Sequence, residues 1–167
     1  MTELTMLEKA LAEEVAVYRR LLELGQKKTG VLAAREVKEL ERLSEEESEL
    51  ISQAVEIEQR RLESLQVLAE HFHVPLGELT LARLAQLAGQ SHGETLRRLH
   101  SEIIGVLEEL KRVNHLNSAL IERELAFINY SLDLLVNPKP EGPTYSQEGR
   151  DAEGKGKSRP SVLDVRA

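Results

Sequence analysis

Apolar side chains recur every three or four residues along most of this chain, which is the spacing of one face of an α-helix. The pattern predicts helices over about residues 2–34, 36–71, 80–88 and 92–136. A turn is predicted at Val74-Pro75-Leu76-Gly77, and Gly25 and Gly30 predict a break between residues 25 and 36. The expected fold is all-α: an elongated antiparallel bundle of three long helices plus one short connecting helix.

Two of these predicted helices carry a marked apolar stripe. The stripe of the second helix comprises Leu40, Leu43, Leu50, Ile51, Ala54, Leu62, Leu65 and Leu68. In the last helix every seventh position is apolar, at Leu99, Val106, Val113, Leu120, Phe127 and Leu134. A sustained seven-residue repeat is typical of a helix that packs lengthwise along a seam.

The chemistry of the chain changes after residue 136. Residues 150–159 hold one apolar side chain, Ala152, so they cannot bury enough surface to offset the entropy of ordering. We therefore expect residues 1–136 to form the helical bundle and 137–167 to form a flexible, disordered C-terminal tail. Tyr145 and the apolar residues at 162–165 are islands of the kind that often dock onto partners.

Charge and composition narrow the range of functions. A net charge of −7 disfavours binding to nucleic acid and to anionic membranes. No apolar run approaches the ~18 residues that a membrane span needs. The absence of cysteine excludes disulfides and thiol catalysis and fits a reducing compartment. Because the first residues also lack a signal-peptide pattern, a cytoplasmic location is expected.

The sequence offers no recognisable catalytic chemistry. Its five histidines lack metal-ligand spacing, and it contains neither a phosphate-binding glycine loop nor a nucleophile elbow. Acidic runs such as Glu45-Glu46-Glu47 indicate a solvated helix face. We therefore expect a protein-binding module that is not an enzyme, with no catalytic residues, no metal and no cofactor.

Asn114 and Asn117 are the informative polar residues. They lie one turn apart on the apolar side of the last helix, beside Val113 and Leu120. Asparagine in an apolar seam can fix the register of helices, as it does in coiled coils. It can also line a groove and bind the backbone of a partner, and the spacing favours neither interpretation.

Read in order, these features resemble the FlgN family of flagellar type III export chaperones. The resemblance rests on four features. Residues 110–129 hold the two asparagines followed by an apolar pair and an amphipathic run, and residues 40–61 form an acidic second helix that ends in Gln-Arg. Residues 79–84 form a short connecting helix and residues 144–149 a tail motif around a tyrosine, so together the features span nearly the whole chain.

The resemblance implies a cytoplasmic chaperone that binds the C-terminal segments of hook–filament junction (hook-associated) proteins and delivers them to the flagellar export gate. It implies docking at the gate through Tyr145. The client-binding groove expected from it comprises Asn114, Asn117, Leu120, Ile121, Leu125 and Ile128. The same groove would let the protein form a homo-oligomer when no client is bound.

The main alternative is a self-associating coiled-coil scaffold or adaptor protein. A scaffold would close its whole apolar seam in a homo-oligomer and would not need Tyr145. A chaperone would keep part of the seam open and would need that residue. An enzyme regulator or an unidentified helical-bundle enzyme is a third interpretation, which a turnover assay that lost activity with a single polar substitution would support.

Overall fold

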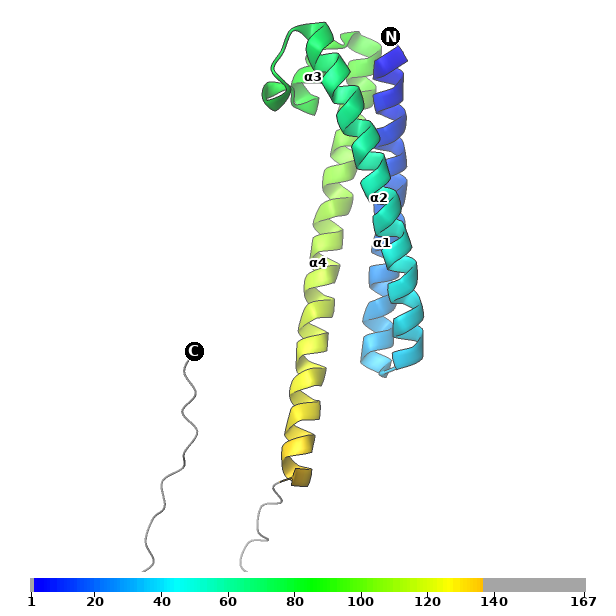
Figure 1. Cartoon of the computed structure of the whole chain (residues 1–167), viewed down its shortest axis with the longest axis vertical. Helices are drawn as coiled ribbons and strands as arrows, with labels where there is room; N and C mark the ends of the chain where they lie inside the picture. The colour runs from blue at the N-terminus through cyan, green and yellow to red at the C-terminus, as the bar shows by residue number, and fades with distance from the viewer. Residues whose placement is uncertain (1, 137–167) are drawn as a thin grey trace, which may run out of the picture. The chain divides into compact units, whose positions relative to one another are not determined.

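The computed structural model describes residues 2–136 (Figure 1). They form α1 (Thr2–Ala34), α2 (Val37–Phe72), a one-turn 3-10 helix η1 (Leu76–Glu78), α3 (Leu81–Leu87) and α4 (Gly89–Val136). Within this described range there is no strand, so the predicted all-α class is confirmed. The predicted tail and its Tyr145 lie outside the described residues.

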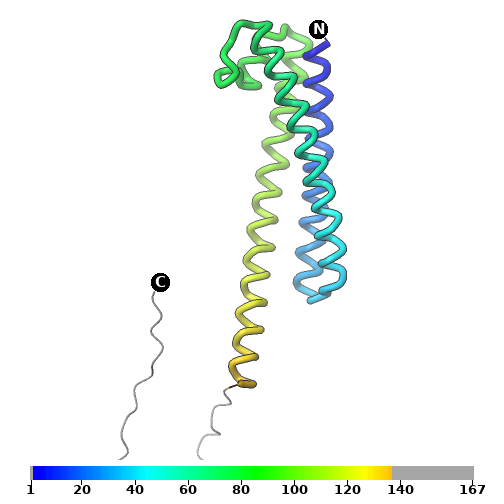
Figure 2. The backbone as a smooth tube through the Cα atoms, viewed as in Figure 1, coloured from blue at the N-terminus to red at the C-terminus, as the bar shows by residue number. Residues whose placement is uncertain are grey.

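Contacts divide the chain into two units, Met1–Tyr130 and Ser131–Ala167, and the packing described here belongs to the first. In that unit α1 and α2 pack against each other as an antiparallel pair (Figure 1). Ion pairs between Lys28 and Glu47 near one end and between Arg60 and Glu13 farther along show this direction. Contacts from α1 to α4 advance in the same direction along both helices, so these two helices run parallel (Figure 2).

The turn between α1 and α2 falls at Arg35 and Glu36, inside the predicted range of 25–36. Arg35 has a φ of 58°, a left-handed conformation that costs a non-glycine residue roughly 1–2 kcal/mol. Its N–H donates to Leu32 O at 3.2 Å, and the N–H of Glu36 donates to Val31 O at 3.1 Å. These bonds end α1 although no glycine is present at the turn, while Gly25 and Gly30 lie inside the helix.

The connection from α2 to α4 is compact. His73, with a φ of 53°, and Val74 donate N–H bonds to the last carbonyls of α2. The Thr80 hydroxyl accepts the N–H of Arg83 at 3.1 Å and caps α3. A Cβ on Gly93 would lie 2.3 Å from Ala85 O, so glycine is needed where α3 and α4 meet.

The prediction that the last helix begins near residue 92 was wrong by three residues. Gly89 has a φ of +80°, and α4 begins at that residue. Because glycine adopts this conformation without the usual steric cost, the chain can leave α3 and enter α4 almost at once. Ser91 is therefore inside the helix, where its carbonyl accepts the Thr95 hydroxyl at 3.3 Å.

Two apolar cores hold the first unit together. The first joins the start of α1, the end of α2, α3 and the start of α4, and includes Leu7, Leu68, Leu84, Leu96 and Leu99. The second lies between α1 and α2, and its buried members are Ala10, Val17, Leu21, Leu24, Leu43, Leu50 and Ile57. No buried member of the second core comes from α4, so α4 is packed most closely near its beginning.

Candidate functional site

Beyond Asn117, α4 keeps its apolar positions but buries none of them among the described residues. Ile121, Leu125 and Ile128 expose 40%, 55% and 49% of their surfaces. Isolated exposed apolar residues are common on proteins, but a contiguous set at helical spacing marks an interaction site. This part of α4 is therefore the first candidate for a binding surface.

A groove of about 300 Å³ lies where α4 passes the turn between α1 and α2. We call it the turn groove. Its walls are mostly apolar and come from the end of α1, the start of α2 and the second half of α4. They comprise Val31, Leu32, Arg35, Glu36, Val37, Leu40, Ile121, Glu124, Leu125, Phe127 and Ile128.

Arg35 connects the helical turn to α4 across this groove. Its guanidinium contacts the Glu124 carboxylate through Nε at 2.9 Å and through a second nitrogen at 3.3 Å. It also lies 5.0 Å from the centre of the Phe127 ring, in a cation–π arrangement. Since both charged side chains are substantially exposed, the ion pair orients the groove wall more than it stabilises the fold.

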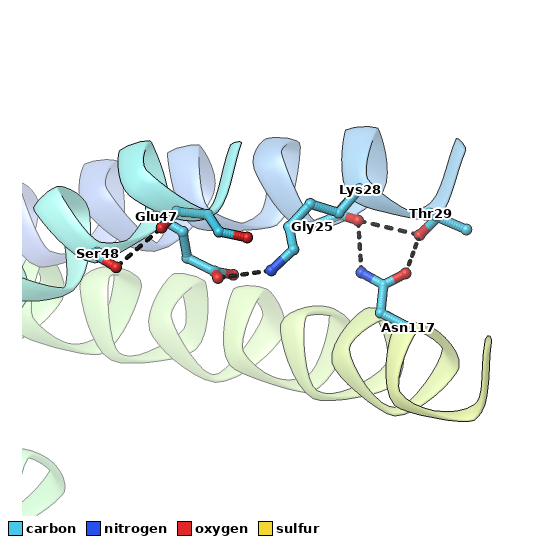
Figure 3. Close-up of polar contacts among 7 residues, drawn as sticks. Gly25, Lys28, Thr29, Glu47, Ser48 and Asn117 are labelled. Atoms are coloured by element: carbon cyan, nitrogen blue, oxygen red, sulfur yellow. Dashed lines mark hydrogen bonds and ion pairs between the residues drawn. The ribbon is translucent and has the colours of Figure 1, made fainter. Parts of the chain in front are cut away.

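Deeper along α4, the Asn117 side chain is buried against α1 (Figure 3). Its amide nitrogen donates to Gly25 O at 2.9 Å, and its amide oxygen accepts the Thr29 hydroxyl at 2.6 Å. Lys28, which precedes Thr29 on α1, forms an ion pair with Glu47 of α2, with 2.7 Å between Nζ and Oε2. These contacts fix α1 against both neighbours at the level where the turn groove begins.

Gly25 explains how α4 comes this close. A Cβ at this position would lie 3.0 Å from Val113 Cγ1, a contact tighter than side chains normally make. The absence of a side chain therefore lets Val113 pack on α1 and lets Asn117 reach the backbone carbonyl of Gly25. The glycine that the sequence pattern treats as a weak point in the helix is a contact surface for α4.

The model of a known protein family, described as FlgN protein, matches residues 1–153. The chain belongs to the FlgN family. As a member it is a flagellar export chaperone, which binds substrates of flagellar export, and the family is one of chaperones and not of enzymes. Comparison with curated proteins and with solved structures gave no significant match.

In this FlgN-family member the six predicted groove residues fall into different environments. Ile121, Leu125 and Ile128 line the turn groove together. Leu120 is half-buried beside it, Asn114 is exposed, and Asn117 is buried against α1. That clients use these six residues stays a prediction.

Sequence reasoning missed the half of the turn groove that comes from the α1–α2 turn. Val37 and Leu40 line it from α2, and Arg35 spans it. An apolar residue at the very start of a helix, Val37, was a weak signal of this part of the groove, because nothing in the sequence shows which helix passes beside it.

The buried carboxylate of Glu14 lies outside the turn groove, between α1 and α2. Oε1 accepts the Tyr18 hydroxyl at 2.9 Å, whereas Oε2 has no hydrogen-bond partner within residues 2–136. Arg61 comes only to 3.7 Å, because Glu58 holds its guanidinium with two bonds. Desolvation by burial raises the pKa of Glu14, and desolvation together with the bond to Glu14 raises the pKa of Tyr18 to about 12.

Other kinds of site find no support in the described part of the chain. Residues 2–136 contain no group of three or more histidine, aspartate or glutamate side chains arranged to hold a metal ion. None of the helices in this range combines the length and apolarity needed to cross a membrane.

Proposed function

We propose that this protein holds the C-terminal segments of hook–filament junction proteins in the cytoplasm and delivers them to the flagellar export gate. The client would lay its apolar face into the turn groove, against Ile121, Leu125 and Ile128. An amphipathic segment in an apolar groove is a common mode of peptide recognition. Membership of the FlgN family supports a client that is a substrate of flagellar export.

The observation that carries this proposal is the exposed apolar wall of α4. Ile121, Leu125 and Ile128 are apolar at helical spacing, they face a common groove, and each leaves about half of its surface uncovered. Covering them would remove apolar surface from water at roughly 25 cal/mol per Å². A client segment would supply that cover until export.

Calorimetric titration of the protein with C-terminal peptides of junction proteins from its source organism tests this directly. We expect saturable one-to-one binding with a negative change in heat capacity, because apolar surface is buried. Leu125→Ser should weaken binding about ten-fold or more, which corresponds to roughly 1.4 kcal/mol at a central contact. Leu87→Ser on α3 is the matched control, since Leu87 is also exposed and does not line the turn groove.

Delivery to the gate is tested through Tyr145, which lies in the part of the sequence that resembles the family's tail motif. Tyr145→Ala should leave peptide affinity unchanged and should reduce secretion of junction proteins into the culture medium. Normal secretion by this variant would remove Tyr145 from the delivery step and leave client binding untouched.

Self-association is the second candidate, and the same exposed wall of α4 favours it. In that case sedimentation of the client-free protein would give a discrete oligomer, and Leu125→Ser would return it to a monomer. If such an oligomer formed and no junction-protein peptide bound, the scaffold function would replace the chaperone function proposed above.

A further inference from the structure

The turn groove is one end of a longer apolar face on α2. Val37 lines the groove, and Val55 lies 18 residues later, which is five full turns of an α-helix. Val55 therefore points to the same side of α2 as Val37, and Ile51 and Leu62 lie within ~40° of that direction. All four side chains are more than 40% exposed, so the described residues leave this side of α2 largely uncovered.

An equivalent face runs along α4. Leu125 lines the turn groove, and Leu107 lies 18 residues before it, again five turns away on the same side of the helix. Ile121 also lines the groove, and all three side chains expose 40% or more of their surface. We call Ile51, Val55 and Leu62 the α2 wall, and Leu107, Ile121 and Leu125 the α4 wall.

A polar layer interrupts both walls at one level. Leu125 of α4 and Val37 of α2 both line the turn groove, and these two helices run antiparallel. Asn114 lies 11 residues before Leu125, and Ser48 lies 11 residues after Val37. Because the two residues are the same distance from the groove along their helices, they lie at the same level. The Ser48 hydroxyl donates to Ser44 O at 3.0 Å and is already satisfied (Figure 3). The exposed Asn114 amide makes no hydrogen bond within residues 2–136, so it is open to a partner.

Charge decides between a second copy of this chain and a different partner. Helix α2 carries ten acidic and four basic side chains, so most of the protein's net charge of −7 lies on this one helix. Two copies meeting through their α2 walls would bring these acidic helices together, which is unfavourable. Glu41 lies ~40° from the direction of Val55 at the edge of the wall and makes no ion pair within residues 2–136. A partner with basic residues along its edge complements this surface.

We propose that the α2 and α4 walls together bind one amphipathic α-helix of the client, with basic residues along the edge that meets α2. This inference rests on the function proposed above and adds the conformation, length and charge of the bound segment. From Val37 to Leu62 the face spans ~37 Å, which a helix of about 25 residues matches. The segment would be apolar near both ends, with a polar side chain between them that hydrogen-bonds Asn114.

The α2 wall is tested by a pair of valines on the same helix. Val55 and Val67 are both exposed, at 65% and 48%, but their side chains point ~120° apart, so Val67 lies off the α2 wall. With the C-terminal junction-protein peptide that binds wild-type protein, Val55→Ser should lower affinity three- to ten-fold and Val67→Ser less than two-fold. Both variants should keep the wild-type circular dichroism, since neither side chain is buried.

The charge of the client is tested by reversing one charge at the edge of the wall. Glu41→Lys should lower the affinity several-fold at low ionic strength and have little effect at 0.5 M salt, because screening weakens exposed pairs. Glu49→Lys makes the same change in net charge on a side of α2 that points ~120° from Val55, and it should alter affinity less than two-fold. Equal effects from the two reversals would overturn a basic edge on the client.

Helix formation by the client is measured in the same titration by circular dichroism. Binding should increase the total helical signal by up to about 25 residues' worth relative to the separately recorded spectra of protein and free peptide, since isolated helices are marginal in water. Client binding that is unaffected by Val55→Ser, or that adds no helical signal, would overturn this inference and leave the proposed chaperone function standing. If no junction-protein peptide binds at all, that result would overturn both the proposed chaperone function and this inference.

Discussion

Asn114 and Asn117 are three residues apart on α4, yet their side chains are in opposite environments. Asn117 is buried and bonded to Gly25 and Thr29, whereas Asn114 is exposed. Of the two roles that the sequence left open, Asn117 has the contacts of a residue that fixes α4 on α1. Asn114 has the exposure of a residue that meets a partner.

Unfolding measurements should separate the two residues. Asn117→Ala removes two hydrogen bonds from a buried site, and we expect it to lower the free energy of unfolding by about 1–2 kcal/mol. Asn114→Ala at an exposed site should change it by less than about 0.5 kcal/mol. Urea unfolding followed by circular dichroism measures both, and equal losses would mean that Asn117 does not anchor α4.

The sequence could not distinguish these two asparagines for a physical reason. Both lie near Val113 on the apolar side of α4, and helical spacing alone leaves either of them at the edge of the stripe. Which one is buried depends on the side from which α1 approaches. That approach is set by Gly25, 92 residues away in sequence from Asn117.

Glu14 is a residue whose charge works against folding at neutral pH. Burial raises its pKa above the ordinary value of 4.5, so the folded protein holds this proton to a higher pH than the unfolded chain does. In the window between these two values the folded state binds more protons. The contribution of Glu14 to the free energy of unfolding is therefore fully present below pH 4.5. That contribution is lost as the pH rises through the folded-state pKa of Glu14.

Glu14→Gln should raise the melting temperature at pH 7. The amide oxygen can still accept the Tyr18 hydroxyl, while the cost of burying a charge with an unbonded oxygen disappears. The difference from wild type should shrink as the pH falls toward 4.5, because the raised pKa of Glu14 leaves a growing fraction of the wild-type carboxyl protonated in the folded state. Calorimetric melting from pH 4.5 to 8 measures this trend, and a difference that did not vary with pH would contradict it.

At the scale of the helices, Gly25 and Gly30 look alike in sequence and differ in the fold. Both lie inside α1, and each is expected from helix propensity to weaken it. A side chain on Gly30 would meet nothing within 4 Å, whereas one on Gly25 would press on Val113. Only Gly25 therefore has a reason to be glycine.

Alanine at these two positions should change stability in opposite directions. Gly30→Ala should raise the free energy of unfolding by about 0.5–1 kcal/mol through helix propensity. Gly25→Ala should lower it by about 1 kcal/mol, since crowding of Val113 and loosening of the Asn117 bonds outweigh that gain. Val113→Ala should lower the free energy of unfolding less in the Gly25→Ala variant than in the wild type, because it also relieves the crowding. Equal losses in the two backgrounds would mean that the alanine at position 25 does not crowd Val113.

The apolar stripe of α2 does not form a single buried surface. Leu43, Leu50, Leu65 and Leu68 are buried, but Ile51 and Leu62 are exposed. Ile57, which the stripe omitted, is also buried. The reason is that α1 covers one side of α2 and the described residues leave the next side largely open, so part of the stripe is core and part is surface.

At the scale of the whole molecule, the helix pattern indicated more apolar seam than the chain can cover. The seven-residue repeat of α4 runs unbroken through Leu99, Val113 and Phe127, and its spacing is the same throughout. Leu99 and Val113 are buried, whereas Phe127 is about half exposed. The spacing of apolar residues predicts that a surface must cover this face of α4. Only the packing of the other helices shows which part of the face they cover and which part they leave exposed.

This gradient along α4 should be visible in hydrogen–deuterium exchange. Leu96, Leu99 and Ile103 belong to a core, while residues 118–130 bury no side chain. Because the free energy of local opening follows burial, amides at 118–130 should exchange at least ten-fold faster than those at 96–103 in client-free protein. A bound junction-protein peptide should slow exchange at 118–130 and in the α2 segment 37–62, with little change at 96–103. Slow exchange at 118–130 without any peptide would mean that another surface already covers α4, which is the behaviour expected of the self-associating scaffold.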